Sequence, residues 1–167
     1  YLKETQHNKL SHIAALSRIE EDHFVWMDQF TIRNLELVQS TGVNGVSLLN
    51  VLDQTVSPMG ARMLRRWLVL PLKEQKAIKD RLNIVDYFTH HGDAADELVL
   101  EIKKMGDLER LISKVATARI CPREVVQLKR ALNAIVPVIE FCFASKNKCL
   151  VKLASQLNPC DAIREEI

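Results

Sequence analysis

The side chains that could bind a metal or act in catalysis are scattered along this sequence. The cysteines and histidines are Cys121, Cys142, Cys149, Cys160, His7, His12, His23, His90 and His91. Their spacing contains neither a Cys-x-x-Cys pair nor a His-x-x-x-His pair, the arrangements that commonly hold zinc. The sequence therefore predicts no metal site and no secreted disulfide framework, and a reduced cytoplasmic chain is the simplest interpretation.

Two neighbouring pairs could still be imagined as acid and base. His90 and His91 precede Gly92 at a predicted helix end, where imidazoles commonly meet exposed carbonyl groups. Asp107 and Glu109 lie two positions apart, a spacing that points side chains to different sides of a helix, and Asp107 suits a helix cap. We favour these structural roles and predict no catalytic residue.

Phosphate could be bound by a glycine-rich loop or by basic side chains. No glycine in the chain is followed by lysine, so the Gly-x-x-x-x-Gly-Lys-Ser/Thr nucleotide loop is absent and no cofactor site is expected here. Arg62, Arg65 and Arg66 fall on the polar side of one predicted helix and could reach phosphate oxygens. A solvated or salt-bridged interdomain face is the alternative that we favour for them.

Hydrophobic spacing predicts the elements that must position these residues. Apolar residues recur at helical spacing near residues 2–17, 48–55, 58–70, 77–90, 94–105, 108–115, 122–143, 148–157 and 161–167. Aromatic and β-branched residues at 24–27, with a return at 35–38, indicate two short paired strands. The predicted fold class is mainly α, an irregular multi-helix bundle with a small two-stranded β element near residues 23–39.

Capping and helix-ending residues mark where these predicted helices begin and end. Ser47, Ser57, Asp93 and Asp107 are predicted N-caps, and Pro58 suits a first helical position. Pro71 should stop the helix that begins at Pro58, and Gly92 and Gly106 should follow helix ends, whereas Pro137 should kink or interrupt the helix that Cys121-Pro122 opens. Met59, Met63 and Trp67 form an apolar stripe that we expect to be a packing centre, and if Trp67 is core, Trp67→Ala should cost about 3–5 kcal/mol.

Composition limits the class of protein. The chain has 167 residues, 47% of them hydrophobic and 26% charged, which suits one globular domain. A net charge of +2 argues neither for nor strongly against nucleic acid. No apolar run approaches the roughly 20 residues of a membrane span, so no membrane partner is expected. The absence of Met at position 1 and the helical pattern at both ends suggest that the sequence is a piece of a longer chain.

Several ordered blocks resemble the MutS family of DNA mismatch-repair proteins. The blocks are Thr31–Leu37, Ser47–Thr55, Ser57–Leu68, Gly106–Lys114 and Pro122–Glu124. They include the Gly-Asp-Leu-Glu-Arg run and the Pro-Arg-Glu helix start, and together they cover about residues 23–130. Cys121 stands where family members often carry Ser, and residues 138–167 resemble the family only in helical character.

The resemblance implies a helical core (lever) domain at residues 23–167, preceded at residues 1–22 by a connector-to-core linking helix. It implies that the chain is non-catalytic and relays conformational change between mismatched DNA and an ATPase domain. The Phe-x-Glu mismatch reader is absent here, because no Phe has Glu two positions later. ATP and Mg²⁺, mismatched duplex DNA, a second MutS subunit and MutL would then engage other domains. A bacterial cytoplasmic location, nucleoid-associated on DNA, is implied too.

Two other functions remain open from the residues. A stand-alone helical module could bind the DNA backbone without sequence preference through the three arginines, with strong salt dependence. A protein-interaction module would instead expose an apolar patch.

Overall fold

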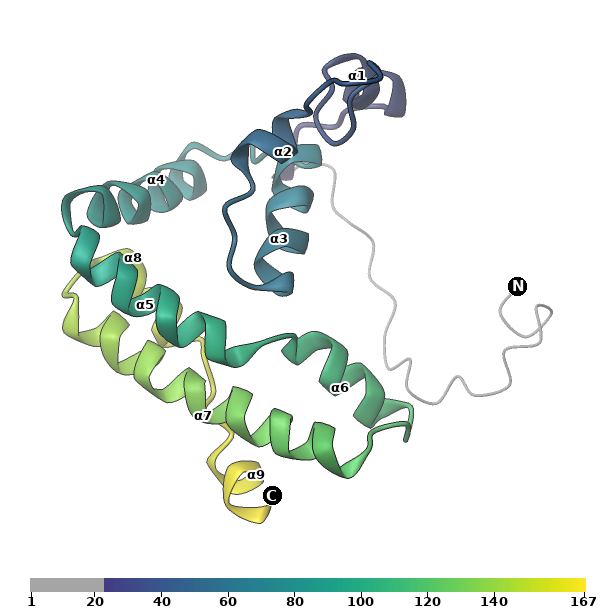
Figure 1. Ribbon diagram of the computed structural model, residues 1–167. Helices are drawn as coiled ribbons and strands as arrows, with labels where there is room; N and C mark the ends of the chain where they lie inside the picture. Colours follow the sequence, from purple (N-terminus) through teal and green to yellow (C-terminus); the bar gives the residue numbers. More distant parts are fainter. Residues whose placement is uncertain (1–22) are drawn as a thin grey trace.

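The computed structural model of the chain describes residues 23–167, and the helix predicted near residues 2–17 lies outside them. The described residues form helices joined by short links, except for the longer loop at residues 35–47 between the first two helices (Figure 1). In chain order these are α1 (Gln29–Asn34), α2 (Leu48–Leu52), α3 (Pro58–Val69), α4 (Gln75–His90), α5 (Gly92–Met105), α6 (Leu108–Ala116), α7 (Pro122–Ala144), α8 (Lys148–Ala154) and α9 (Asp161–Glu166). The mainly α fold class is confirmed.

The predicted pair of strands is wrong. Residues 23–167 contain only an isolated antiparallel bridge between Phe24 and Leu72, and the Val25 amide donates to the Pro71 carbonyl at 2.7 Å. Between the two predicted strands the chain turns into α1, because the Asp28 carboxylate accepts from the Thr31 amide at 2.6 Å and caps a helix start. The carbonyls that follow α1 accept from the first amides of α2 instead of a partner strand.

Most predicted helix starts are confirmed. Ser47 Oγ accepts from the Asn50 amide at 3.2 Å, and Ser57 Oγ accepts from the Gly60 amide at 3.1 Å. Pro58 occupies the first turn of α3. The cap Ser47 is fully buried. Helix α2 ends at Leu52, earlier than Thr55, and α3 ends at Val69, before Pro71 as predicted.

Two predictions about helix ends need correction. Asp93 does not cap α5, because the helix already begins at Gly92 and Asp93 lies in its first turn. Of the two outcomes predicted at Pro137, a kink or an interruption, the interruption does not occur, since α7 runs from Pro122 to Ala144 with Pro137 inside it. An internal proline removes one backbone hydrogen bond. Here residues on both sides of it, Ile135 and Val138, are buried in the core, and this burial keeps the helix continuous.

The core lies along α7. One buried cluster comprises Leu111, Leu128, Leu132 and Ile135, with Met105 and Leu108 packed against it. A second comprises Val138, Cys142, Leu150 and Ala154, against which side chains of α4 and α5 pack. Helices α5, α6, α8 and α9 all contact α7, and α4 contacts α5 and α8. We call residues 75–167 the α7-centred bundle.

The residues before Gln75, which we call the α1–α3 segment (residues 23–74), have no comparable core. Ser47 is the only buried residue in this segment. Its exposed large apolar side chains are Val25, Trp26, Phe30, Leu35, Val43, Val46, Leu48, Val51, Leu52, Met63 and Trp67. In Figure 1, α1 to α3 lie apart from the helices around α7. Nowhere in residues 23–167 is there a helix long and apolar enough to cross a membrane.

Candidate functional site at the junction of α3 and α6

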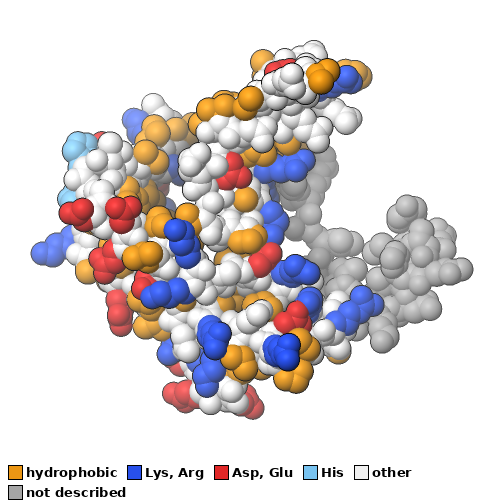
Figure 2. Space-filling view, in the orientation of Figure 1, with side chains coloured by type: hydrophobic (Ala, Val, Ile, Leu, Met, Phe, Trp, Pro, Cys, Tyr) orange, Lys and Arg blue, Asp and Glu red, His pale blue; other side chains and the backbone are white. Residues whose placement is uncertain are grey.

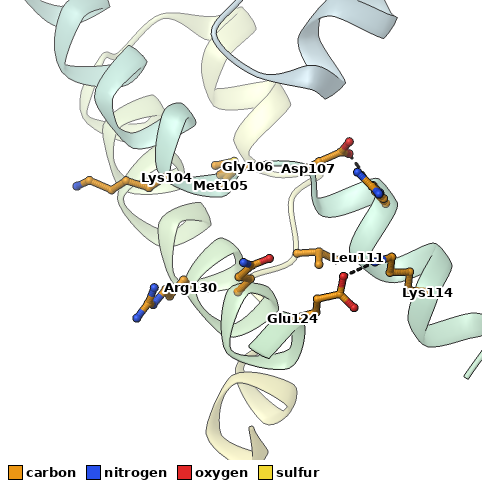
Figure 3. Close-up of a pocket in the computed structure, with 10 residues that line it drawn as sticks. Lys104, Met105, Gly106, Asp107, Leu111, Lys114, Glu124 and Arg130 are labelled. Carbon is orange, nitrogen blue, oxygen red and sulfur yellow. Dashed lines mark hydrogen bonds and ion pairs between the residues drawn. The ribbon is translucent and has the colours of Figure 1, made fainter. Parts of the chain in front are cut away.

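The turn between α5 and α6 holds an acidic side chain in a fixed position. Gly106 ends α5 with a φ of 60°, a backbone conformation that residues with a Cβ atom rarely adopt. Asp107 follows as the N-cap of α6, and its Oδ1 accepts from the Arg110 amide at 3.3 Å, as the sequence predicted. Figure 3 shows Asp107 at the start of α6, directly after Gly106. The glycine therefore sets the direction in which the carboxylate projects.

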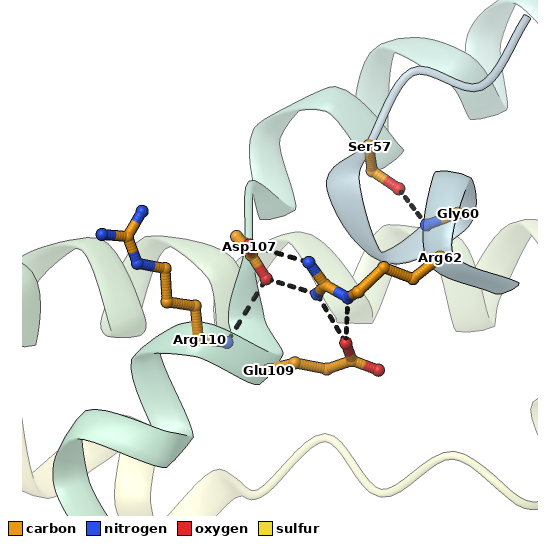
Figure 4. A network of polar contacts seen from close by, with 6 residues as sticks. All are labelled: Ser57, Gly60, Arg62, Asp107, Glu109 and Arg110. Carbon is orange, nitrogen blue, oxygen red and sulfur yellow. Dashed lines mark hydrogen bonds and ion pairs between the residues drawn. The ribbon is translucent and has the colours of Figure 1, made fainter.

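Arg62 of α3 reaches this turn from 45 residues away (Figure 4). Its Nη2 and Nη1 donate to the two carboxylate oxygens of Asp107 at 2.7 and 3.1 Å. Its Nε donates to Glu109 Oε2 at 2.8 Å. The planar guanidinium thus binds two carboxylates with separate edges, a geometry that a lysine ammonium cannot reproduce. We call these three residues the Arg62 junction.

The sequence interpretation of Asp107 and Glu109 was incomplete. Helical geometry separates side chains two positions apart, but Asp107 is a cap with φ −104° and ψ 75°, outside the helical region. Its carboxylate can therefore meet the same guanidinium as Glu109 while it still caps α6. Both carboxylates accept hydrogen bonds from Arg62, and their role in the described structure is to join two helices.

Electrostatics favour the ionised form of this junction. The Arg62 guanidinium donates to Asp107 and holds the pKa of that carboxyl below its usual value. The same two carboxylates raise the pKa of Arg62 above its already high value. The Arg62 side chain remains 49% exposed, so water screens these attractions. The junction fixes a relative position of two helices more than it adds stability.

The three arginines predicted as one face have different surroundings. Arg62 is engaged with Asp107 and Glu109, whereas Arg65 and Arg66 are exposed and form no ion pair within residues 23–167. Arg66 lines a groove beside α3, and Arg65 does not. The predicted phosphate or interdomain role remains a prediction for Arg65 and Arg66, while for Arg62 the contact is within the chain.

The apolar stripe of α3 lines that groove instead of forming a packing centre. The groove has a volume of about 390 Å³, and its walls include Met59, Met63 and Trp67. Met63 is 54% exposed and Trp67 is 41% exposed, which contradicts the expectation that this stripe is core. The guanidinium carbon of Arg81 lies 3.7 Å from the centre of the Trp67 ring, a cation–π contact between α4 and α3. No local pattern in the sequence could have paired these two residues.

The paired histidines have the structural role that we favoured. His90 Nδ1 lies 2.8 Å from the Asp86 carbonyl oxygen, and His91 Nδ1 lies 2.8 Å from that of Tyr87. Both imidazoles thus contact the carbonyl end of α4. The part of the chain described here shows no group of three His, Cys, Asp or Glu residues that could hold a metal ion.

Comparison with known proteins places the chain in a family. A family model described as MutS domain III matches residues 30–167. The chain belongs to the MutS family. DNA mismatch repair protein MutS of Parabacteroides distasonis is 53% identical over all 167 residues, that of Bacteroides thetaiotaomicron is 52% identical, and that of Flavobacterium psychrophilum is 51% identical. The chain covers only 19% of the length of each of these relatives.

The Arg62 junction joins two of the blocks on which the MutS resemblance rests. Arg62 lies in the block Ser57–Leu68, and its partners lie in the block Gly106–Lys114. These blocks are distant in sequence, and the fold of this MutS domain III brings them into direct contact. Of the three arginines on the predicted face, Arg62 alone forms ion pairs within residues 23–167. It is therefore the least available of the three to a ligand or to another domain.

Proposed function

We propose that this MutS domain III relays conformational change between mismatch-bound DNA and the ATPase domain of the whole protein, without catalysis of its own. The observation that carries this proposal is the Arg62 junction, a polar contact that connects the α1–α3 segment to the α7-centred bundle. A relay needs parts that move as units and a contact between them that has few arrangements.

The two parts meet the first requirement differently. Residues around α7 share a packed apolar core, so displacement of one helix must be accommodated by its neighbours. Helix α3 is a capped unit of 12 residues without a buried side chain, so it can change position without opening a core. A shift of α3 against the bundle would chiefly alter the Arg62 junction and the Trp67–Arg81 contact.

The exposed position of the junction suits a contact that must open. A buried ion pair that loses one partner leaves an unpaired charge in the protein interior, at a high cost in free energy. At the Arg62 junction, the Arg62 and Glu109 side chains are 49% and 64% exposed, so water can replace each partner. Binding of a ligand elsewhere can therefore shift the equilibrium between closed and open arrangements.

The uncovered side of α3 supports a contact with a neighbouring domain. The groove beside α3 combines Met63 and Trp67 with the exposed Arg66. Large apolar patches on protein surfaces commonly mark interaction sites. Because four fifths of the length of the relatives lies outside this chain, we propose that another domain covers this groove. A stand-alone module is not favoured, since the full chain matches about a fifth of the length of larger proteins.

Ligands and partners of the whole protein follow from the same proposal. Mismatched duplex DNA, a second MutS subunit, MutL, and ATP with Mg²⁺ would engage other domains, in a bacterial cytoplasm. Residues 1–22 would link the connector domain to this core, and residues 23–167 would form the core itself. In the relay, domain III would transmit a change in affinity that is reciprocal between the DNA and nucleotide sites.

The test is the coupling between those two sites in full-length protein. The affinity for a slowly hydrolysed ATP analogue is measured with and without mismatched duplex, and the ratio defines the coupling factor. Arg62→Gln should reduce that factor by about 2- to 30-fold, the range expected when a residue transmits coupling. Affinity for the analogue without DNA should change little, because Arg62 contacts neither ligand.

Arg65→Gln is the matched control. It removes the same charge from the same helix, but Arg65 forms no ion pair within residues 23–167. An equal loss of coupling in both variants would indicate an effect of charge alone and would contradict the relay through Arg62. An unchanged coupling factor in Arg62→Gln would contradict it as well.

A further inference from the structure

A hollow on the other side of the α5–α6 turn has an excess of positive charge that the relay does not use. It lies between the end of α5, the start of α6 and the first half of α7, and has a volume of about 380 Å³. Its basic lining residues are Lys104, Arg110, Lys114 and Arg130, and its acidic ones are Asp107 and Glu124. The hollow alone therefore carries as large a positive excess as the whole chain, whose net charge is +2.

Both carboxylates of the hollow are already engaged by cations. Asp107 binds Arg62, which approaches from outside the hollow. Glu124 pairs with Lys114, and it also accepts from the Cys121 amide at 3.1 Å. The Lys114 ammonium is the main reason that the pKa of Glu124 lies below its usual value. Arg110 also attracts Asp107 through space and lowers the pKa of that carboxyl, but less than Arg62 does, and neither carboxylate forms an ion pair with Arg110 or Arg130 within residues 23–167.

Two guanidinium groups in the hollow form no ion pair within residues 23–167. Arg110 and Arg130 are exposed, and neither side chain forms an ion pair or a hydrogen bond within residues 23–167. Figure 4 shows the Arg110 side chain pointing away from the Arg62 junction, although its backbone amide is bound to Asp107. Arg110 is thus positioned by its backbone, and its guanidinium is available to a ligand.

Gln127 provides a further donor, whereas Lys104 already pairs with Glu101 at 2.6 Å. Gln127 lies three positions before Arg130, so the two side chains share one face of α7. Figure 3 shows Lys104 and Arg130 reaching out on one side of the hollow and the Lys114–Glu124 pair on the other. The space-filling view shows basic side chains gathered over α5, α6 and α7 (Figure 2). The buried Leu111 lines the floor.

We propose that this hollow is a binding site for phosphate groups, held chiefly by Arg110 and Arg130. Guanidinium groups bind phosphate oxygens through two parallel hydrogen bonds, and free guanidinium groups from two elements can engage one anion together. The phosphate could belong to a nucleic-acid backbone or to a free polyphosphate. The site does not depend on the relay, because it shares with the Arg62 junction only Asp107, which faces Arg62.

The experiment uses the 167-residue chain with two probes, a fluorescently labelled, perfectly paired short duplex and inorganic tripolyphosphate. Binding is measured by anisotropy for the duplex and by calorimetry for tripolyphosphate, at low and moderate salt. The double variant Arg110→Gln/Arg130→Gln should bind at least one probe about tenfold or more weakly than the parent chain, since it loses two charge-assisted donors. For the duplex, the salt dependence should also become shallower by about 1–2 in logarithmic slope.

The control is the double variant Lys76→Gln/Lys79→Gln, which removes the same charge from two exposed positions of α4. It should keep the affinity of the parent chain within about twofold, the scatter expected for exposed charges remote from a site. Circular dichroism and thermal unfolding verify that both double variants remain folded. Loss of duplex binding alone would assign the site to a nucleic-acid backbone, and loss of tripolyphosphate binding alone would assign it to a free anion. Absence of binding by the parent chain, or equal weakening in both double variants, would overturn the proposal.

Discussion

The α1–α3 segment and the α7-centred bundle are both helical, but different interactions hold them. In the bundle, apolar side chains from α4 to α9 pack against one long helix. In the segment, side-chain caps such as Ser47 and Ser57, together with single hydrogen bonds between loops, fix each short helix. Polar caps can define where a helix begins, but burial of apolar surface provides most of the stability of a packed unit. The segment therefore depends on its neighbours more than the bundle does.

The largest difference between the regions should appear when a leucine is truncated in each. Leu150 of α8 is 3% exposed, and Leu150→Ala should lower the free energy of unfolding by about 2–5 kcal/mol because it leaves a cavity. Leu52 of α2 is 47% exposed, and Leu52→Ala should cost less than about 1 kcal/mol. Urea denaturation of the 167-residue chain measures both. Equal losses would show that the two regions share one core.

Truncation of Trp67 sharpens the comparison at the boundary of the two regions. Because the side chain is 41% exposed and packs against Arg81, Trp67→Ala should cost about 1–2 kcal/mol, less than a core tryptophan would. Trp67→Phe keeps an aromatic face under Arg81 and should lose less. Thermal unfolding followed by calorimetry compares the two variants. A loss of about 3–5 kcal/mol in the free energy of unfolding would show instead that Trp67 is a core residue.

The smallest effect concerns the pH dependence of the contact between the regions. Arg62 holds the pKa of Asp107 below its usual value, so the ionised carboxylate favours the folded state above the unfolded pKa of about 3.9. That contribution is lost as the pH falls through the lower, folded pKa. Arg62→Gln should raise the pKa of Asp107 toward its ordinary value, as measured by NMR titration of the carboxyl carbon. Arg65→Gln should leave it unchanged, and an unchanged pKa in Arg62→Gln would show that the junction does not form in solution.

Local chemistry predicted the helices better than the contacts between them. Ser57-Pro58 and Asp107 start α3 and α6 because capping depends only on residues within one turn. The strand prediction was wrong because it rested on the aromatic and β-branched residues at 24–27 and did not take account of Asp28. That residue caps α1, and a helix cap is as local a signal as a run of strand-forming residues. The blocks that resemble MutS and the hydrophobic periodicity both indicated the mainly α fold class.

The candidate site was predicted only in part. The polar face of α3 could be located from spacing, but the partners of Arg62 are 45 and 47 residues away, and helical periodicity contains no information on such pairs. Exposure of the Met59, Met63 and Trp67 stripe could not be foreseen either. An apolar stripe shows that a helix has a side to cover, and it does not show whether the covering residues belong to the same piece of chain.

The continuity of α7 through Pro137 has a mechanical consequence. A helix of 23 residues is about 35 Å long, and the two apolar clusters along it meet on either side of Pro137, at Ile135 and Val138. Because both clusters pack against the same unbroken helix, a displacement of α7 should shift both clusters together. Pro137 lies between the two clusters, so the packing of Ile135 and Val138 supports the helix at the position where one backbone hydrogen bond is missing.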